Sequence, residues 1–90
     1  MEKSGPRLTA NRKQQKALLS LVRQLRVEAG FRQIDMARAL GKPQAFVSYY
    51  ESGTRRLDLL ELRQICRILD VTLVDFVRRF ESALKNPDKA

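Results

Sequence analysis

Apolar residues recur at helical spacing in the first third of the chain. Five of them fall on one stripe of a helix, at i, i+3, i+4, i+7 and i+11: Leu18, Leu21, Val22, Leu25 and Ala29. Gly30 follows this stripe, and glycine is favoured just after a helix because it adopts the left-handed conformation. Asn11 is a candidate N-cap, with Gln14 as its reciprocal partner. The pattern predicts an amphipathic helix from about residue 14 to Gly30.

Two much shorter helices are predicted next. The first covers residues 33–40 and ends at Gly41, and the second runs from Pro43 or Gln44 to Glu51 and ends before Gly53. The apolar spacing assigns the inward positions, which are Met36, Ala37 and Leu40 in one helix and Val47 and Tyr50 in the other. The tight glycine turn between the two helices predicts a compact pair.

The remaining pattern predicts two further helices, each with a capping signal. Asp58 and Glu61 have the spacing of a capping box, and Thr72 with Asp75 has it again. Asp70 takes the place of the usual glycine after the fourth helix. The expected inward residues are Leu62, Ile65, Cys66 and Leu69 in the fourth helix, and Leu73, Phe76, Val77, Phe80 and Leu84 in the fifth.

These elements predict an all-α fold of five short helices around one core. The expected organisation is a flexible basic arm over residues 1–13, a five-helix domain over residues 14–85 and a disordered tail over residues 86–90. A length of 90 residues is enough for one domain of this kind. No apolar run exceeds three residues, so we expect no membrane span and no secretory signal, and a cytoplasmic location.

The residue inventory argues against an enzyme. The sequence has a single cysteine, Cys66, and no histidine. A zinc site needs about four Cys, His or carboxylate ligands, and histidine is the commonest general acid–base. A close carboxylate pair and a glycine-rich phosphate loop are also missing from the sequence. We therefore expect no catalytic residue, no metal, no cofactor and no small-molecule ligand.

The positive charge is concentrated in the first part of the chain. The formal net charge is +8, and residues 1–56 carry 12 basic and 4 acidic side chains, whereas residues 57–90 carry 6 of each. A charge asymmetry of this kind is compatible with a solvated basic surface and with a face that binds a polyanion. Charge alone leaves both interpretations open.

Residues 33–52 have the physical parts of a helix-turn-helix. Ala37 is small enough for the two helices to approach, Gly41 permits the turn, and Val47 fixes the crossing angle at ~90–120°. Such an angle makes the second helix protrude as a ridge. A protruding helix of two turns fits the major groove of B-DNA, which is ~12 Å wide.

Residues 21–81 resemble the lambda repressor and Cro type (Xre-like) family of helix-turn-helix regulators. The resemblance rests on these segments: Leu25-Arg26, Gln33, Met36-Ala37, Leu40-Gly41, Val47-Ser48, Tyr50-Glu51-Ser52-Gly53 and Leu69-Asp70-Val71. It implies a lambda-repressor-like fold of five helices and a protein that represses or regulates transcription as a dimer on operator DNA. Within this class, a phage-type repressor, a restriction-system controller and an antitoxin all stay open.

The resemblance also implies roles for individual residues. Gln33 matches the family glutamine that binds a phosphate. Gln44 matches the family position that reads a base, and a glutamine amide can pair with N6 and N7 of adenine. The expected base-reading residues are Gln44, Ala45, Ser48 and Tyr49, and the expected phosphate-binding residues are Gln33, Arg32, Arg38, Lys42, Arg55 and Arg56. Glu51 is expected to pair with a nearby arginine.

One recognition helix reads only a few base pairs, so a dimer is expected on a two-fold symmetric site. The candidate dimer surface is an apolar stripe of the fifth helix: Val74, Phe76, Val77, Phe80 and Leu84. The same stripe is compatible with closure of the monomer core. The predicted function is therefore a sequence-specific double-stranded DNA-binding repressor. The alternatives are a protein-interaction module or antitoxin-type adaptor that keeps the fold with weak DNA reading, and an RNA-binding role.

Overall fold

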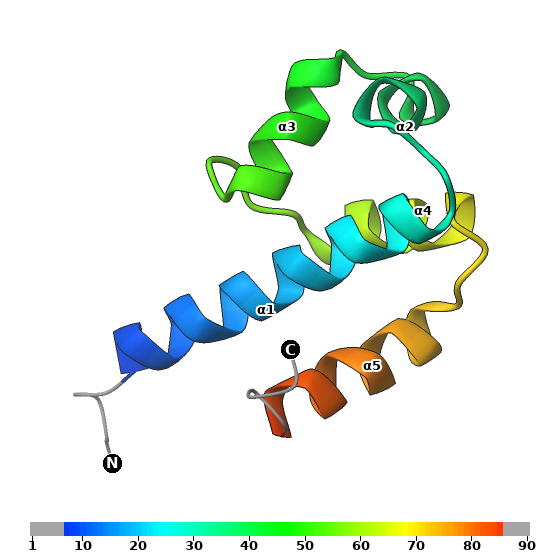
Figure 1. Ribbon diagram of the computed structural model, residues 1–90. Coiled ribbons are helices and arrows are strands. Elements are labelled where there is room, and N and C mark those ends of the chain that lie inside the picture. The colour runs from blue at the N-terminus through cyan, green and yellow to red at the C-terminus, as the bar shows by residue number, and fades with distance from the viewer. Residues whose placement is uncertain (1–6, 86–90) are drawn as a thin grey trace.

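Five helices and no strand make up the part of the chain that the structure describes (Figure 1). The computed structural model describes the backbone of residues 7–85 and the side chains of residues 11–85. The helices are α1 (Arg7–Glu28), α2 (Gln33–Leu40), α3 (Gln44–Ser52), α4 (Leu59–Ile68) and α5 (Leu73–Lys85). The all-α, five-helix prediction is confirmed.

The helix boundaries follow from local capping. At the start of α4, Asp58 accepts a hydrogen bond from the Glu61 N–H at 2.8 Å, and Glu61 accepts one from the Asp58 N–H at 2.9 Å. The predicted capping box is therefore confirmed. Thr72 Oγ1 accepts from the Asp75 N–H at 3.0 Å, which confirms the predicted cap of α5. After α4, Asp70 adopts φ +61° in place of the usual glycine, also as predicted.

A single core fills the space between the helices. It is lined by buried side chains from all five helices: Val22, Leu25, Met36, Ala37, Val47, Tyr50, Ile65, Cys66, Leu69 and Phe76. The long helix α1 packs against α3 and α5, while α2 packs against α3 and α4. Figure 1 shows α2 and α3 together on one side of α1, with α5 on the other. The core thus packs the α2–α3 pair, through α3, against the long helix α1.

The N-terminal prediction needs correction. The helix α1 begins at Arg7, so residues 7–13 are helical and not a flexible arm, and Asn11 lies inside the helix rather than at its N-cap. Apolar spacing locates the buried face of a helix, and the exposed residues 11–14 carry no such pattern. Residues 1–6 of the predicted arm and the predicted tail, 86–90, lie outside the described residues. No helix in the described part is long and apolar enough to cross a membrane.

Candidate nucleic-acid interface

A tight turn joins α2 to α3 and fixes the direction of both. Gly41 adopts φ +69°, and the Lys42 N–H donates to the Ala37 carbonyl at 2.9 Å. This is the hydrogen-bond pattern of a helix that ends in a left-handed residue, which glycine occupies without steric cost. The side chains of Ala37 and Val47 are fully buried where α2 packs on α3. The predicted pair of short helices is confirmed, with Gly41 in the turn and with Ala37 and Val47 buried.

The opposite face of α3 is open to solvent. Gln44 and Ala45 are exposed in its first turn, Ser48 is half-buried, and Tyr49 is 51% exposed. The buried face of the same helix carries Val47 and Tyr50, which explains why the other side chains project away from the protein. The four residues predicted to read bases therefore occur on one exposed surface of α3.

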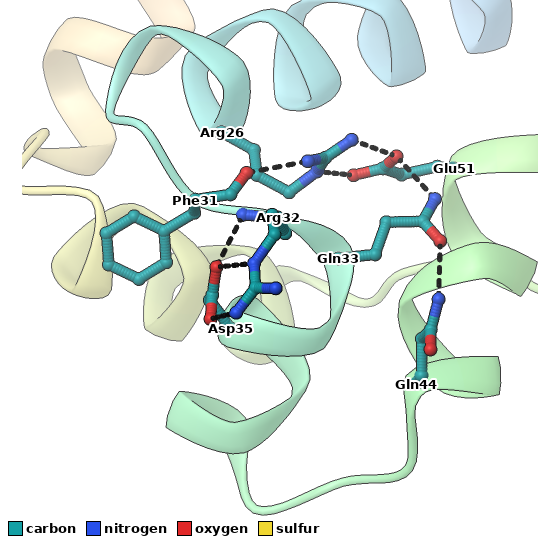
Figure 2. Close-up of polar contacts among 7 residues, drawn as sticks. All are labelled: Arg26, Phe31, Arg32, Gln33, Asp35, Gln44 and Glu51. Carbon is teal, nitrogen blue, oxygen red and sulfur yellow. Dashed lines mark hydrogen bonds and ion pairs between the residues drawn. The ribbon is translucent and has the colours of Figure 1, made fainter.

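A buried ion pair lies behind this surface. The Arg26 guanidinium donates to both oxygens of Glu51, at 2.6 and 3.1 Å, and to the Phe31 carbonyl at 2.7 Å (Figure 2). The two side chains are 9% and 4% exposed. The hydrogen bond with Glu51 raises the pKa of Arg26. The expectation that Glu51 pairs with an arginine is confirmed, and the partner is Arg26 of α1.

A chain of hydrogen bonds runs from this ion pair to the tip of α3. The Gln33 Nε2 donates to Glu51 Oε1 at 3.1 Å, and the Gln44 Nε2 donates to Gln33 Oε1 at 3.4 Å (Figure 2). A carboxylate only accepts hydrogen bonds, so it requires Gln33 to turn its NH₂ group inward and its oxygen outward. That oxygen in turn attracts the NH₂ group of Gln44. The orientation of both amides is thus set by a buried charge.

The start of α2 is stabilised by an ion pair and not by the serine or threonine hydroxyl that often caps a helix. Asp35 accepts from the Arg32 N–H at 2.9 Å, and the Arg32 guanidinium binds the same carboxylate at 2.9 Å through Nε and Nη2. The hydrogen bond from Arg32 lowers the pKa of Asp35 to about 2. Arg38 Nη1 lies 3.9 Å from the same carboxylate. Both arginine side chains stay largely exposed to solvent.

Phe46 forms a support between two basic side chains. Its ring packs edge-on against Tyr50, with the ring centroids 5.7 Å apart. The Lys42 ammonium lies 5.5 Å from the Phe46 ring centroid and the Arg55 guanidinium lies 4.6 Å from it. Cations at these distances are attracted by the ring face. Phe46 therefore contacts side chains from both the turn before α3 and the loop after it.

The Arg55 guanidinium forms an ion pair and a hydrogen bond to a backbone carbonyl, which its position in the sequence does not indicate. Its Nη1 and Nη2 donate to the two oxygens of Glu61 at 3.1 and 2.7 Å, and Nη1 also donates to the Arg56 carbonyl at 2.9 Å. The hydrogen bond with Arg55 lowers the pKa of Glu61. Arg56 and Lys42 are exposed and make no ion pair with any described residue. Of the predicted phosphate-binding set, Lys42 and Arg56 thus make no ion pair with a described acid, although Lys42 is near enough to Glu61 to contribute to the lowering of its pKa.

The predicted dimer surface on α5 divides into two parts. Phe76 is 1% exposed and belongs to the core, so its side chain is unavailable to a partner and its inclusion needs correction. Val74 and Val77 are 63% and 43% exposed, and Phe80 and Leu84 are half-buried beside them. The outer edge of α5 therefore remains a candidate contact surface, formed by these four residues.

Comparisons with known proteins agree with this geometry. The sequence model of a family described as helix-turn-helix matches residues 22–76, which is more than half of the chain. Among solved structures, an XRE-family like protein from Pseudomonas syringae pv. tomato str. DC3000 is similar, with a TM-score of 0.81 and 34% sequence identity over 88% of this chain and 96% of that chain. No curated protein matches the chain. The family match includes the whole α2–turn–α3 unit.

Proposed function

Because the chain belongs to the Xre-type helix-turn-helix family of DNA-binding regulators, we propose that it reads a specific operator sequence as a dimer and represses transcription. Each subunit inserts the exposed face of α3 into the major groove of double-stranded DNA. Gln44, Ala45, Ser48 and Tyr49 contact the bases. Gln33, Arg32, Arg38, Lys42, Arg55 and Arg56 surround them and bind or face the phosphates.

The hydrogen-bonded chain Arg26–Glu51–Gln33–Gln44 is the observation that carries this proposal. With one N–H directed at Gln33, the Gln44 amide keeps its carbonyl oxygen and its second N–H for a ligand. This is the donor and acceptor pair that adenine requires, because N6 donates and N7 accepts in the major groove. A pre-oriented amide loses little conformational freedom on binding, which favours affinity and selectivity.

The unpaired basic side chains support a polyanionic ligand. Lys42 lies before α3 and Arg56 lies after it, so the two charges flank the exposed face of the helix. Each phosphate contact of this kind adds a salt-dependent increment to affinity without reading sequence. Gln33 adds a neutral contact, since one N–H of its amide is left after the bond to Glu51.

The short length of the recognition helix favours a dimer. One short helix contacts too few base pairs to distinguish an operator among genomic sites. Two copies related by a two-fold axis bring two such helices to successive major grooves ~34 Å apart. We assign the contact between copies to the outer edge of α5, at Val74, Val77, Phe80 and Leu84.

Selection of binding sites from random duplexes tests the proposal. The wild-type protein should recover a two-fold symmetric site, and Gln44→Ala should relax the preference at one position in each half-site, by ~1–3 kcal/mol. Gln64→Ala, which removes an exposed glutamine on α4, is the matched control. A loss spread evenly over all sequences would contradict base reading by Gln44. The absence of any sequence preference would favour the protein-interaction module instead.

Repression is tested separately. A reporter gene with the selected site inside its promoter should be expressed less in the presence of the wild-type protein than in the presence of Gln44→Ala. Increased expression would assign the protein as an activator and leave the DNA-reading proposal intact.

A further inference from the structure

A basic groove lies between α1 and the end of α3, away from the exposed first turn of the recognition helix. It has a volume of about 610 Å³, and its cationic lining consists of Arg12, Lys16 and Arg23 from α1 and Arg56 from the loop after α3. In Figure 1, α1 extends past the end of α3 on the side where the α3–α4 loop projects.

The three α1 cations form a straight row. Arg12, Lys16 and Arg23 are spaced at i, i+4 and i+11, which is one stripe of a helix. At 1.5 Å per residue the row is ~16 Å long. A strand of duplex DNA carries one phosphate for every ~3.4 Å along the helix axis, so a row of this length faces several phosphates.

The positive charge of the groove is not offset by nearby acids. Glu51 is the single acidic residue in the described lining, and its carboxylate is 4% exposed and bound to Arg26 and Gln33. None of the four lining cations makes an ion pair with a described residue. An extended anionic ligand therefore meets four available charges with no exposed carboxylate among them.

The groove begins where the recognition helix ends. Its second wall is formed by Glu51, Ser52 and Gly53, and a Cβ on Gly53 would lie 3.4 Å from the Leu19 side chain of α1. This close packing places the row of α1 charges directly beside the end of α3. A duplex that receives α3 in its major groove continues past that end, and its backbone is the nearest polyanion available to the row.

From these observations we infer that the groove binds the phosphate backbone of DNA flanking the base pairs that α3 reads. The inference rests on the proposed function and adds a second contact surface to it. Bound backbone phosphates lie along Arg12 and Lys16, with Arg23 and Arg56 at the inner end of the groove. The surface contributes affinity and salt dependence but no sequence preference.

The test compares duplexes of two lengths that carry the selected site. The long duplex extends about ten base pairs beyond the site on each side, and the short one ends at the outermost base pair. The double variant Arg12→Ala, Lys16→Ala should lower the slope of log affinity against log salt by about 2 on the long duplex. Between 50 and 200 mM salt, the variant should therefore lose about tenfold less affinity than the wild type. On the short duplex the two proteins should bind alike.

The control is a double variant that removes the same charge elsewhere. Arg63 and Arg67 are exposed on α4 and also stand four residues apart. Their replacement by alanine should leave the slope on the long duplex unchanged to within about 0.5. Alanine is a strong helix former, so both double variants should fold.

Several outcomes overturn the inference. An unchanged slope for the Arg12, Lys16 variant, or an equal decrease in the α4 variant, removes the groove from the DNA contact. A decrease of the salt slope by the same amount on the short duplex also removes the groove from the DNA contact. If, in addition, polyglutamate binds the wild type and fails to bind the Arg12, Lys16 variant, the groove is assigned to an acidic protein segment. All of these outcomes leave the Gln44 test untouched, whereas a wild-type protein without sequence preference overturns both proposals.

Discussion

Glu51 binds Arg26 through both of its carboxylate oxygens, although the two residues are 25 positions apart in the sequence. The ion pair fastens the end of α3 to α1, and it also orients Gln33. It therefore serves the stability of the fold and the arrangement of the exposed glutamines at once.

Removing one partner of this pair should destabilise the protein. Glu51→Ala leaves the Arg26 charge buried without its carboxylate, and we expect the free energy of unfolding to fall by about 3 kcal/mol. Urea unfolding followed by circular dichroism measures the change. The double variant Arg26→Met, Glu51→Leu replaces both charges with apolar groups and should lose less than Glu51→Ala alone. A double variant as unstable as the single one would contradict this account.

The hydroxyl of Tyr50 should lower the stability of the protein. The side chain is fully buried, and its hydroxyl has no hydrogen-bond partner among the residues that the structure describes. Burial raises the pKa of this hydroxyl. Because burying an unpaired hydroxyl is unfavourable, Tyr50→Phe should raise the free energy of unfolding by up to about 1 kcal/mol. Tyr49→Phe, at an exposed position of the same helix, is the control and should have no effect. A clear loss of stability in Tyr50→Phe would mean that the hydroxyl is bound.

Asp35 should give the protein a component of acid sensitivity. Its pKa is about 2 in the folded protein, below the ordinary value of 3.8, because Arg32 binds the ionised carboxylate. A lowered folded pKa stabilises the protein above the unfolded pKa, and this contribution is lost as the pH falls through the folded pKa. The melting temperature of the wild type should exceed that of Asp35→Asn above about pH 5, and the difference should shrink between about pH 4 and pH 2. A difference that is the same at pH 6 and pH 2 would contradict the pairing.

Arg55 and Arg56 should differ in what they contribute to binding. Arg56→Ala removes an unpaired charge and should lower the salt slope of DNA binding by about 0.9. Arg55→Ala breaks the ion pair with Glu61 and the contact with Phe46, so it should lower the melting temperature and change the slope less than Arg56→Ala does. Filter binding across a range of salt concentrations, together with thermal unfolding, separates the two effects. Equal slopes for the two variants would mean that Arg55 contacts phosphate as directly as Arg56 does.

The outer edge of α5 should control self-association. Val77 is 43% exposed beside the half-buried Phe80 and Leu84, so a charge at this position meets solvent in the monomer and an apolar surface in the proposed dimer. Val77→Glu should shift the dimer toward monomers in sedimentation equilibrium, by about tenfold or more in dissociation constant. Val27→Glu is the matched control, since Val27 is 56% exposed on α1. If Val27→Glu dissociates the dimer and Val77→Glu does not, the interface lies elsewhere.

Most of the fold follows from local signals in the sequence. The bounds of α2, the capping box of Asp58 and Glu61 and the left-handed Asp70 were all predictable, because each depends on residues within one or two helical turns. The start of α1 was not predictable from the sequence. Residues 11–14 of α1 are exposed, so no apolar stripe marks them, and Asn11 has the residue type of a cap without occupying the position of one.

The sequence predicts candidate residues for the site, but it does not predict the contacts between them. The helix-turn-helix spacing identifies Gln33 and Gln44, but the path Arg26–Glu51–Gln33–Gln44 crosses three helices and depends on packing. The same holds for the groove, because Arg56 is distant in sequence from Arg12 and Lys16. The clustering of basic residues before residue 57 was the one available signal, and it did not indicate which of them share a surface.

The anchoring of Gln44 limits how this protein can acquire a new target sequence. Replacement of Gln44 or Gln33 removes a member of the hydrogen-bonded chain that ends at the buried ion pair, so each change leaves a neighbouring polar group without that partner. Ala45 and Tyr49 are exposed and lie outside that network. Divergence of specificity among duplicated copies should therefore begin at these two positions, where a substitution alters the surface offered to bases at little cost to folding.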